Sequence, residues 1–470
     1  MELFGTAGIR GPVTRVTPEL ALAVGRAVGK DALDGTGTVV LGRDGRDTGT
    51  ALAAAVEAGV TSAGADVCRG GQLPTPALAF ASRGRHGIML TASHNPPADN
   101  GIKMFEDGRE YDRDAEARIE RRVETRTRVD ATDTDTTTNT AVAGIAATEW
   151  DAWGQVDTTS VLPTYREAVV EYTRDHGGHP ELTVAVDCGN GMSSLVAPQV
   201  LTDLGVDVMA LNASVDGHFT ARESKPTAES LVDIRRFVAD GPATFGIGHD
   251  GDADRLVVVD GDGEVVHEDT ILAIVAGHYV RESDADDPVV VTTPNASGRI
   301  DEHVRASGGR VERVRLGALH EGITTARANG GVGTEVVFAA EPWKHIHPGF
   351  GEWIDAVVST ALFTRLVAES GLDALREPIR ERPYRKKSVD CPDGRKTPVM
   401  KRLETTLPDT FPQAAVDTEY GIRLELPDGS WTLVRPSGTE PYVRAYAESD
   451  DVDELVGTVV ECIEQAVDGR

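Results

Sequence analysis

Short apolar runs that alternate with helical stretches constrain this chain most strongly. The segments 39–41, 182–186 and 289–291 have the length and composition of buried strands, and a stretch with helical character follows each of them. Strands separated by helices are typical of layered α/β structure. The 470 residues leave room for three or four domains of about 100–150 residues each.

The first helix has a clear start signal. Thr17 can cap a helix, and Pro18 suits the first helical position. Leu20, Val24 and Val28 recur every four residues and predict an apolar stripe. Further helices are expected at 50–63, 193–204, 298–307, 318–329 and 353–368, the last as the final strong helix. Further strands are expected at 87–90, 207–211, 244–248, 311–314 and 335–339, and a hairpin from 256–259 and 264–266.

Composition marks the boundaries between domains. Residues 128–148 are rich in Thr, Asp and Ala and predict a linker, and a Pro- and Arg-rich stretch at 377–386 predicts another. We therefore expect four domains, at 1–150, 151–260, 261–376 and 377–470.

Charge and composition exclude several classes of partner. The formal net charge of −29 argues against a nucleic acid or an anionic membrane. No apolar run reaches the ~18 residues of a membrane helix, and the first residues lack a signal-peptide pattern. The four cysteines form no C-x-x-C pair, which favours reduced thiols in the cytoplasm. The acidic excess with few lysines suggests adaptation to concentrated salt, a hypothesis that equal stability and activity in dilute buffer would contradict.

One candidate site is the loop that follows the strand at 87–90. It presents Ser93 and His94 at the carboxyl end of a strand, where open α/β sheets place ligands. A serine hydroxyl can carry a phosphoryl group when bases and cations stand nearby, and His94 and Lys103 are candidates for moving the proton. A polar surface turn remains the alternative.

A second candidate is an acidic loop after the strand at 244–248. Asp250, Asp252 and Asp254 occupy alternate positions, so their carboxylates can converge on a hard cation such as Mg²⁺, Mn²⁺ or Ca²⁺. A calcium EF-hand is disfavoured because Arg255 and Gly261 stand where it needs Gly and Glu. Three carboxylates leave open positions, which suits Mg²⁺ bound to a phosphate oxygen. A solvated acidic turn remains the alternative.

Two further segments carry weaker signals. The segment 435–444 combines arginines with hydroxyls and a glycine, which favours a phosphate cradle over an ordinary β-turn. The segment 341–345 lies between an expected strand and an expected helix, and its Glu341 and Trp343 could bind a sugar, whereas a histidine such as His345, taken alone, is more often structural. The chain contains neither a P-loop nor a G-x-S-x-G motif, which disfavours P-loop NTPases and α/β-hydrolases.

In this order the segments resemble the α-D-phosphohexomutase family, which includes phosphoglucomutase, phosphomannomutase and phosphoglucosamine mutase. The resemblance also covers Phe4–Gly11 and Gly42–Arg46, so it extends over nearly the whole chain. It implies three related α/β domains with mixed sheets and a smaller C-terminal α+β domain around a central active-site cleft. Details at 216–219 and 225–227 look more like the archaeal phosphoglucosamine-mutase type.

The resemblance also implies a role for each candidate residue. One Mg²⁺ per site would be held by Ser93, once phosphorylated, and by Asp250, Asp252 and Asp254. The catalytic group would be Ser93, His94, Lys103 and Arg10, with Lys103 in proton transfer. The substrate-binding group would be Arg255, Glu341, His345, Arg435, Ser437, Gly438, Thr439 and Arg444.

The activity implied is an intramolecular phosphotransfer. It interconverts a hexose 6-phosphate and a hexose 1-phosphate through a phosphoserine and a bisphosphorylated sugar, which also activates Ser93. The enzyme would act on glucosamine, glucose or mannose phosphate, as a monomer or homodimer. One departure concerns the sugar-recognition loop, where Trp343 and Lys344 replace the usual Ser and Gly. A metal-dependent phosphatase and a non-catalytic sugar-phosphate-binding protein remain alternatives.

Overall fold

The computed structural model describes residues 3–5, 8–128, 145–437 and 440–469. Two compact units are defined by their internal contacts: unit 1 comprises Met1–Glu268 and Trp343–Leu375, and unit 2 comprises Asp269–Pro342 and Arg376–Arg470. Among the described residues, no helix combines the length and apolar character needed to cross a membrane.

The first sheet of unit 1 has seven strands in the order β1-β5-β4-β2-β3-β7, with β6 beside β5. Strands β2, β3 and β4 run parallel, and β5 is antiparallel to β4, so the sheet is mixed. Its strands are β1 (Ile9–Pro12), β2 (Thr38–Arg43), β3 (Asp66–Gln72), β4 (His86–Leu90), β5 (Asp99–Glu106), β6 (Arg109–Glu110) and β7 (Val156–Thr158). The associated helices are α1 (Pro18–Ala32), α2 (Gly49–Ser62), α3 (Thr75–Ala81) and α4 (Arg113–Arg128).

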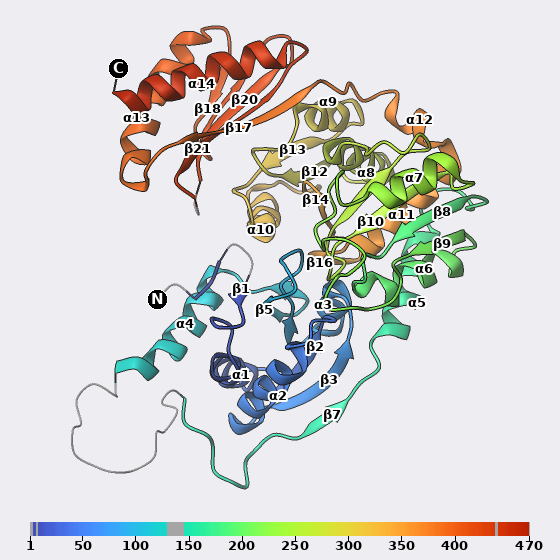
Figure 1. Cartoon of the computed structure of the whole chain (residues 1–470), viewed down its shortest axis with the longest axis vertical. Coiled ribbons are helices and arrows are strands. Elements are labelled where there is room, and N and C mark those ends of the chain that lie inside the picture. The colour runs from blue at the N-terminus through green and yellow to red at the C-terminus, as the bar shows by residue number, and fades with distance from the viewer. Residues whose placement is uncertain (1–2, 6–7, 129–144, 438–439, 470) are drawn as a thin grey trace. The chain divides into compact units, whose positions relative to one another are not determined.

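Helix α1 illustrates how the local signals determine the packing. The hydroxyl of Thr17 accepts the amide of Leu20 at 3.3 Å, so the expected cap is present. Val24 and Val28 are fully buried and Leu20 packs at the edge of the same core, which confirms the predicted stripe. Helices α1 and α2 lie side by side (Figure 1).

The second sheet of unit 1 has four strands in the order β11-β10-β8-β9. Strand β10 is parallel to β8 and antiparallel to β11, so this sheet is also mixed. The strands are β8 (Thr183–Asp187), β9 (Asp207–Leu211), β10 (Phe245–His249) and β11 (Leu256–Val259); the antiparallel pair β15 (Lys344–His347) and β16 (Gly351–Ile354) also belongs to unit 1. The helices are α5 (Leu162–Arg174), the 3-10 helix η2 (Met192–Leu195), α6 (Ala197–Asp203), α7 (Val232–Asp240) and α11 (Ala356–Ser370).

Unit 2 contains one parallel and one antiparallel set of strands. Strand β12 (Asp287–Thr292) pairs in parallel with β13 (Arg310–Arg313) and with β14 (Thr334–Glu341). The antiparallel sheet has the order β17-β21-β20-β19-β18 and comprises β17 (Tyr384–Asp390), β18 (Ala415–Asp417), β19 (Ile422–Glu425), β20 (Trp431–Pro436) and β21 (Tyr442–Glu448). The helices are α8 (Glu268–Glu282), α9 (Gly298–Ala306), α10 (Leu319–Asn329), α13 (Asp393–Thr410) and α14 (Val452–Asp468), and α12 (Leu372–Arg376) connects the units along the chain. Helices α13 and α14 lie side by side (Figure 1).

The predicted fold class is confirmed: mixed α/β sheets are followed by a C-terminal antiparallel sheet with helices. The four domain boundaries stay a prediction, and most of the expected linker at 128–148 lies outside the described residues.

The predictions for four segments were wrong in whole or in part. The segment 353–368 begins as strand β16 and becomes helical only after Asp355, which caps α11 by accepting the amides of Val357 and Val358. It is also not the final strong helix, because α13 and α14 follow. The expected helix at 193–204 is divided into η2 and α6. The expected hairpin is present, since Val265 pairs antiparallel with Val259 of β11, but residues 264–266 make only this single bridge and no full strand. The segment 341–345 joins two strands, β14 and β15, rather than a strand and a helix.

Candidate active site

Ser93 lies on the loop between β4 and β5. It is fully buried, with a φ of 51°, a backbone conformation that residues other than glycine seldom adopt. Its amide donates to the hydroxyl of Thr91 at 2.9 Å. Its hydroxyl donates to Oδ2 of Asp250 at 2.7 Å, and Oδ1 of Asp254 lies 3.5 Å away. The fold therefore holds the serine in a strained conformation with its hydroxyl directed at the acidic loop.

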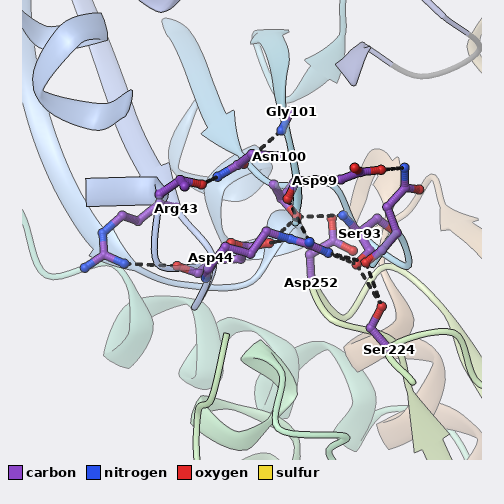
Figure 2. Close-up of polar contacts among 12 residues, drawn as sticks. Arg43, Asp44, Ser93, Asp99, Asn100, Gly101, Ser224 and Asp252 are labelled. Carbon is purple, nitrogen blue, oxygen red and sulfur yellow. Dashed lines mark hydrogen bonds and ion pairs between the residues drawn. The ribbon is translucent and has the colours of Figure 1, made fainter. Parts of the chain in front are cut away.

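A buried arginine organises the serine loop. The guanidinium of Arg46 forms an ion pair with Asp44 at 3.0 Å, and both side chains are inaccessible to solvent. Its remaining N–H groups donate to the backbone carbonyls of Ser93, Asn95, Pro96 and Asp99. Asp44 also accepts the hydroxyl of Thr91 at 2.7 Å. Figure 2 shows this network around Ser93. Burial raises the pKa of Asp44, although the charge of Arg46 opposes that shift.

Residues of the connection between β9 and α7 in the second sheet contact the same loop. The hydroxyl of Ser224 donates to the carbonyl of Asn95 at 3.2 Å (Figure 2). The ring of Phe219 lies 5.0 Å from the guanidinium carbon of Arg46. The same ring lies so close to Gly251 that a Cβ there would stand 3.1 Å from Cζ of the phenylalanine. Phe219 thus contacts both Arg46, which holds the serine loop, and Gly251 of the acidic loop.

The acidic loop follows β10 and brings three carboxylates into one buried group. Oxygen atoms of Asp250, Asp252 and Asp254 all lie within 4.8 Å of one another. Oδ1 of Asp250 accepts the amides of Asp254 and Arg255, each at 3.2 Å, which curls the loop. Thr75 donates its hydroxyl to Oδ2 of Asp252 at 2.6 Å, while Oδ1 of Asp252 is buried without a partner among the described residues. This donor set is one that hard divalent cations prefer.

Lys103 supplies a buried positive charge. Its register in β5, opposite Met89 of β4, directs its ammonium to Asp252 at 3.1 Å and Asp254 at 2.9 Å. Burial opposes the charged form, but these carboxylates outweigh burial and raise the pKa of Lys103. Burial likewise works against ionised Asp254, yet Lys103 holds the pKa of that carboxyl well below its usual range. Burial and the neighbouring carboxylates raise the pKa of Asp250 well above its usual range.

Three further predicted residues surround this group in unit 1. Arg255 lies 3.7 Å from Asp254, and its buried Nε has no hydrogen-bond partner in the described part of the chain. Nε and Nη2 of Arg10 are also buried without such a partner there. Nδ1 of His94 lies 3.4 Å from the hydroxyl of Ser93. Burial and the charge of Arg255 lower the pKa of His94 to about 3, so its ring is neutral near neutral pH.

The predicted phosphate-binding residues lie in unit 2. Arg435 of β20 and Arg444 of β21 are register partners, so the two guanidinium groups extend from adjacent strands. Each has a buried Nε without a hydrogen-bond partner among the described residues, and Arg444 forms an ion pair with Glu440. The hydroxyl of Ser437 accepts the amide of Glu440 at 3.3 Å. The two remaining predicted members, Gly438 and Thr439, lie outside the described residues.

The two predicted sugar-binding residues lie in different surroundings. Glu341 is partly exposed at the end of β14 and accepts the amide of Gly317 at 2.6 Å. His345 is 1% exposed, and its Nδ1 lies 3.1 Å from the hydroxyl of Ser359 on α11. Burial lowers the pKa of His345 to about 3. This enclosed position argues against the predicted contact between His345 and a sugar.

Sequence reasoning assigned no role to several residues of the site. Asp44 and Arg46 belong to a motif that carried the family resemblance, but nothing in the pattern indicated hydrogen bonds to four carbonyls. Thr75 gave no signal, and Phe219 entered only through the segment 216–219 that looked like the archaeal type, because the contacts of both residues depend on how separate elements pack. Lys344 was noted only as a departure from the family pattern.

Comparisons with known proteins identify the class to which this fold and site belong. Residues 1–130 match the family model described as phosphoglucomutase/phosphomannomutase, alpha/beta/alpha domain I. Residues 163–263 match domain II, and residues 389–465 match the C-terminal domain. The chain is 39% identical over 460 residues to a protein of Thermococcus kodakarensis named phosphopentomutase, covering 96% of this chain and 94% of that protein. It is 38% identical over 482 residues to a probable phosphoglucosamine mutase of Methanopyrus kandleri, covering 99% of each.

A solved structure shows the same fold. A phosphoglucomutase/phosphomannomutase family protein from Burkholderia thailandensis superposes with a TM-score of 0.82 at 24% sequence identity, covering 99% of this chain and 97% of that one. The protein is thus a mutase by class. It belongs to the phosphoglucomutase/phosphomannomutase family, the α-D-phosphohexomutases.

Proposed function

We propose that this protein interconverts a hexose 6-phosphate and a hexose 1-phosphate through a phosphorylated Ser93. The observation that carries the proposal is the buried Ser93 hydroxyl, 2.7 Å from Asp250 and on a loop fixed by Arg46. A hydroxyl held rigidly beside acidic groups and cations is suited to carry a phosphoryl group.

The acidic loop fits a magnesium ion. The three clustered carboxylates and the unpartnered Oδ1 of Asp252 form an incomplete oxygen donor set. Asp250, Asp252 and Asp254 would hold Mg²⁺ together with the phosphate on Ser93. When bound, the ion supplies positive charge to the oxygens of the transferring group.

The chain's own residues account for the remaining requirements of phosphoryl transfer. Arg10 and Arg255 have N–H groups available for phosphate oxygens. Lys103 is charged and fully enclosed, so its ammonium stabilises negative charge. As an ammonium it can donate a proton but cannot accept one. His94 is neutral beside the hydroxyl of Ser93 and can accept a hydrogen bond there. In each half-reaction the proton of the attacking hydroxyl is lost as the phosphoryl group arrives, and the departing oxygen regains one.

The cycle needs a second phosphate site. We assign the non-reacting phosphate to Arg435, Ser437 and Arg444, with Gly438 and Thr439 completing that loop. The unpartnered Nε atoms of the two arginines support this assignment. The sugar bisphosphate then turns over so that its other phosphate returns to Ser93, and free sugar bisphosphate would reload an unphosphorylated enzyme.

The sugar itself has two candidates. Relatives named probable phosphoglucosamine mutase favour glucosamine phosphate over glucose or mannose phosphate. A pentose phosphate is the second candidate, because a relative that is 39% identical is named phosphopentomutase. The side chain of Trp343 packs against the core of the second sheet, so no hydroxyl stands where the family's hexose-recognition pattern has Ser.

The test offers glucosamine, glucose, mannose and pentose phosphates side by side and measures the isomerised product and inorganic phosphate. Intact-mass analysis checks for a phosphate on Ser93. Ser93→Ala should abolish turnover and the added mass, whereas Ser82→Ala, which alters another fully buried serine of unit 1, should retain both. Full mutase activity in Ser93→Ala would refute the proposal. Phosphate release without isomerisation would instead identify a phosphatase, and binding without turnover a non-catalytic protein.

A further inference from the structure

We propose that Lys344 binds the phosphoryl group that is transferred at Ser93, which adds a cation to the site from the first residue of β15. The inference rests on the proposed function for the identity of the ligand. It rests on the geometry of unit 1 for the position of the side chain.

The backbone anchors Lys344 next to the acidic loop. The preceding residue, Trp343, has a φ of 70° and its carbonyl accepts the amide of Leu256 at 3.3 Å. Leu256 directly follows Arg255, the last residue of that loop. The indole of Trp343 packs against the core that contains Val257. Lys344 is therefore attached to the carboxyl end of the acidic loop through its neighbour.

The direction of the Lys344 side chain follows from the strand it begins. Successive side chains of a strand point to opposite faces. His345 points to α11, where it meets Ser359 at 3.1 Å. Lys344 therefore faces away from this part of α11, and it is only partly buried.

The ammonium of Lys344 has no hydrogen bond or ion pair within the part of the chain that the structure describes. Burial raises the pKa of Asp254, but the charges of Lys103 and Lys344 outweigh burial and lower that pKa. Burial, Arg255 and Arg10 lower the pKa of His94, and the charge of Lys344 acts in the same direction. These electrostatic effects agree with the backbone contact between Trp343 and Leu256, which places Lys344 beside the acidic loop whose Asp254 lies 3.5 Å from the Ser93 hydroxyl.

Charge balance indicates what Lys344 binds. Four cationic side chains act on the carboxylates of the acidic loop even before any metal ion is counted, and one further carboxylate, Glu110, acts on Lys103. Those cations are Arg10, Lys103, Arg255 and Lys344. The carboxylates already have Lys103, so Lys344 adds positive charge that an anionic ligand can use. A phosphoryl group at Ser93 is the anion that the proposed reaction places there.

The test compares Lys344→Met, which removes the charge at similar length, with Lys344→Arg, which retains it. Lys30→Met serves as the matched control, because Lys30 is another partly buried lysine of unit 1. Steady-state kinetics should show kcat/KM falling at least about tenfold in Lys344→Met, as expected for a lost charge-assisted hydrogen bond, with substantial recovery in Lys344→Arg and no change in Lys30→Met.

A second measurement separates this inference from the proposed function. The affinity of the intact, unphosphorylated protein for inorganic phosphate, in the presence of Mg²⁺, should fall several-fold in Lys344→Met whether or not any sugar phosphate is isomerised. If the wild type isomerises a sugar phosphate but Lys344→Met keeps its kcat/KM and its phosphate affinity, the inference about Lys344 is overturned and the proposed function stands. If no sugar phosphate is isomerised but phosphate affinity depends on Lys344, the proposed function fails and the anion contact stands.

Discussion

Removing the ammonium of Lys103 should destabilise unit 1 strongly, and Mg²⁺ should offset part of the loss. In Lys103→Met, the carboxylates of Asp252 and Asp254 lose a buried partner at 3.1 and 2.9 Å. Breaking a buried ion pair by removing one partner costs about 3–5 kcal/mol. Arg255 remains 3.7 Å from Asp254, so we expect the lower end, about 3 kcal/mol. This is a large part of the ~5–15 kcal/mol that stabilises a typical domain.

The assay is urea unfolding at neutral pH, followed by tryptophan fluorescence, with a chelator or with Mg²⁺ at equal ionic strength. Lys103→Met should unfold earlier in chelator and recover more stability from Mg²⁺ than the wild type does. Adding Asp252→Asn removes one of the uncompensated charges, so the double variant should regain about 1–2 kcal/mol. Lys30→Met is the control. A Lys103→Met protein whose unfolding free energy in chelator lies within about 0.5 kcal/mol of the wild type, as for an ordinary surface change, would refute the reasoning.

Two further predictions concern the acidic loop and the serine loop. Because burial and the charge of Asp254 raise the pKa of Asp250, Mg²⁺ binding should release a proton and become tighter as the pH rises. Without metal, the stability that this carboxyl contributes is present at low pH and is lost as the pH rises through its folded pKa. Calorimetry of Mg²⁺ binding in two buffers of different ionisation enthalpy measures the proton release. Identical heats in the two buffers would contradict the predicted proton release. Arg46→Lys should cost about 3 kcal/mol, since a lysine cannot replace the fork of donors to four carbonyls, and should lower phosphorylation of Ser93. Hydrogen exchange reports the loosened loop, and unchanged exchange near Ser93 would count against this role for Arg46.

Local signals in the sequence predicted the elements well where one physical cause dominated. The cap at Thr17 and the stripe of Val24 and Val28 both appear in α1 because capping and apolar periodicity act within a few residues. The boundary near Trp353 was wrong for a local reason too. Asp355 satisfies the first amides of α11, and that capping signal outweighs the apolar pattern before it.

The site was predictable only in part. Ser93 and Asp250 are 157 positions apart, and no periodicity in the sequence indicates that two loops from different sheets meet. The family resemblance suggested their association, whereas the residues alone gave two separate candidates. The contacts of Arg46 could not be predicted. Its guanidinium binds backbone carbonyls, which every residue has, so the loop sequence carries no sign of these hydrogen bonds. Conversely, the resemblance suggested His345 for sugar binding, but the packing of α11 encloses that ring.

The hydrogen bond between Ser93 and Asp250 has a consequence for the order of events in the proposed cycle. The unphosphorylated hydroxyl of Ser93 donates a hydrogen bond to a carboxyl oxygen of Asp250 that lies 2.7 Å away. A phosphoserine dianion has only acceptor oxygens, so the same contact becomes repulsive once the phosphoryl group is attached and Asp250 is ionised. Arg46 and the strained backbone prevent the serine from moving aside, because the loop carbonyls are already bound. A cation between phosphate and carboxylates removes the repulsion, and by thermodynamic reciprocity phosphorylation must then strengthen cation binding. The rigid loop thereby couples the phosphorylation state of Ser93 to the occupancy of the acidic loop.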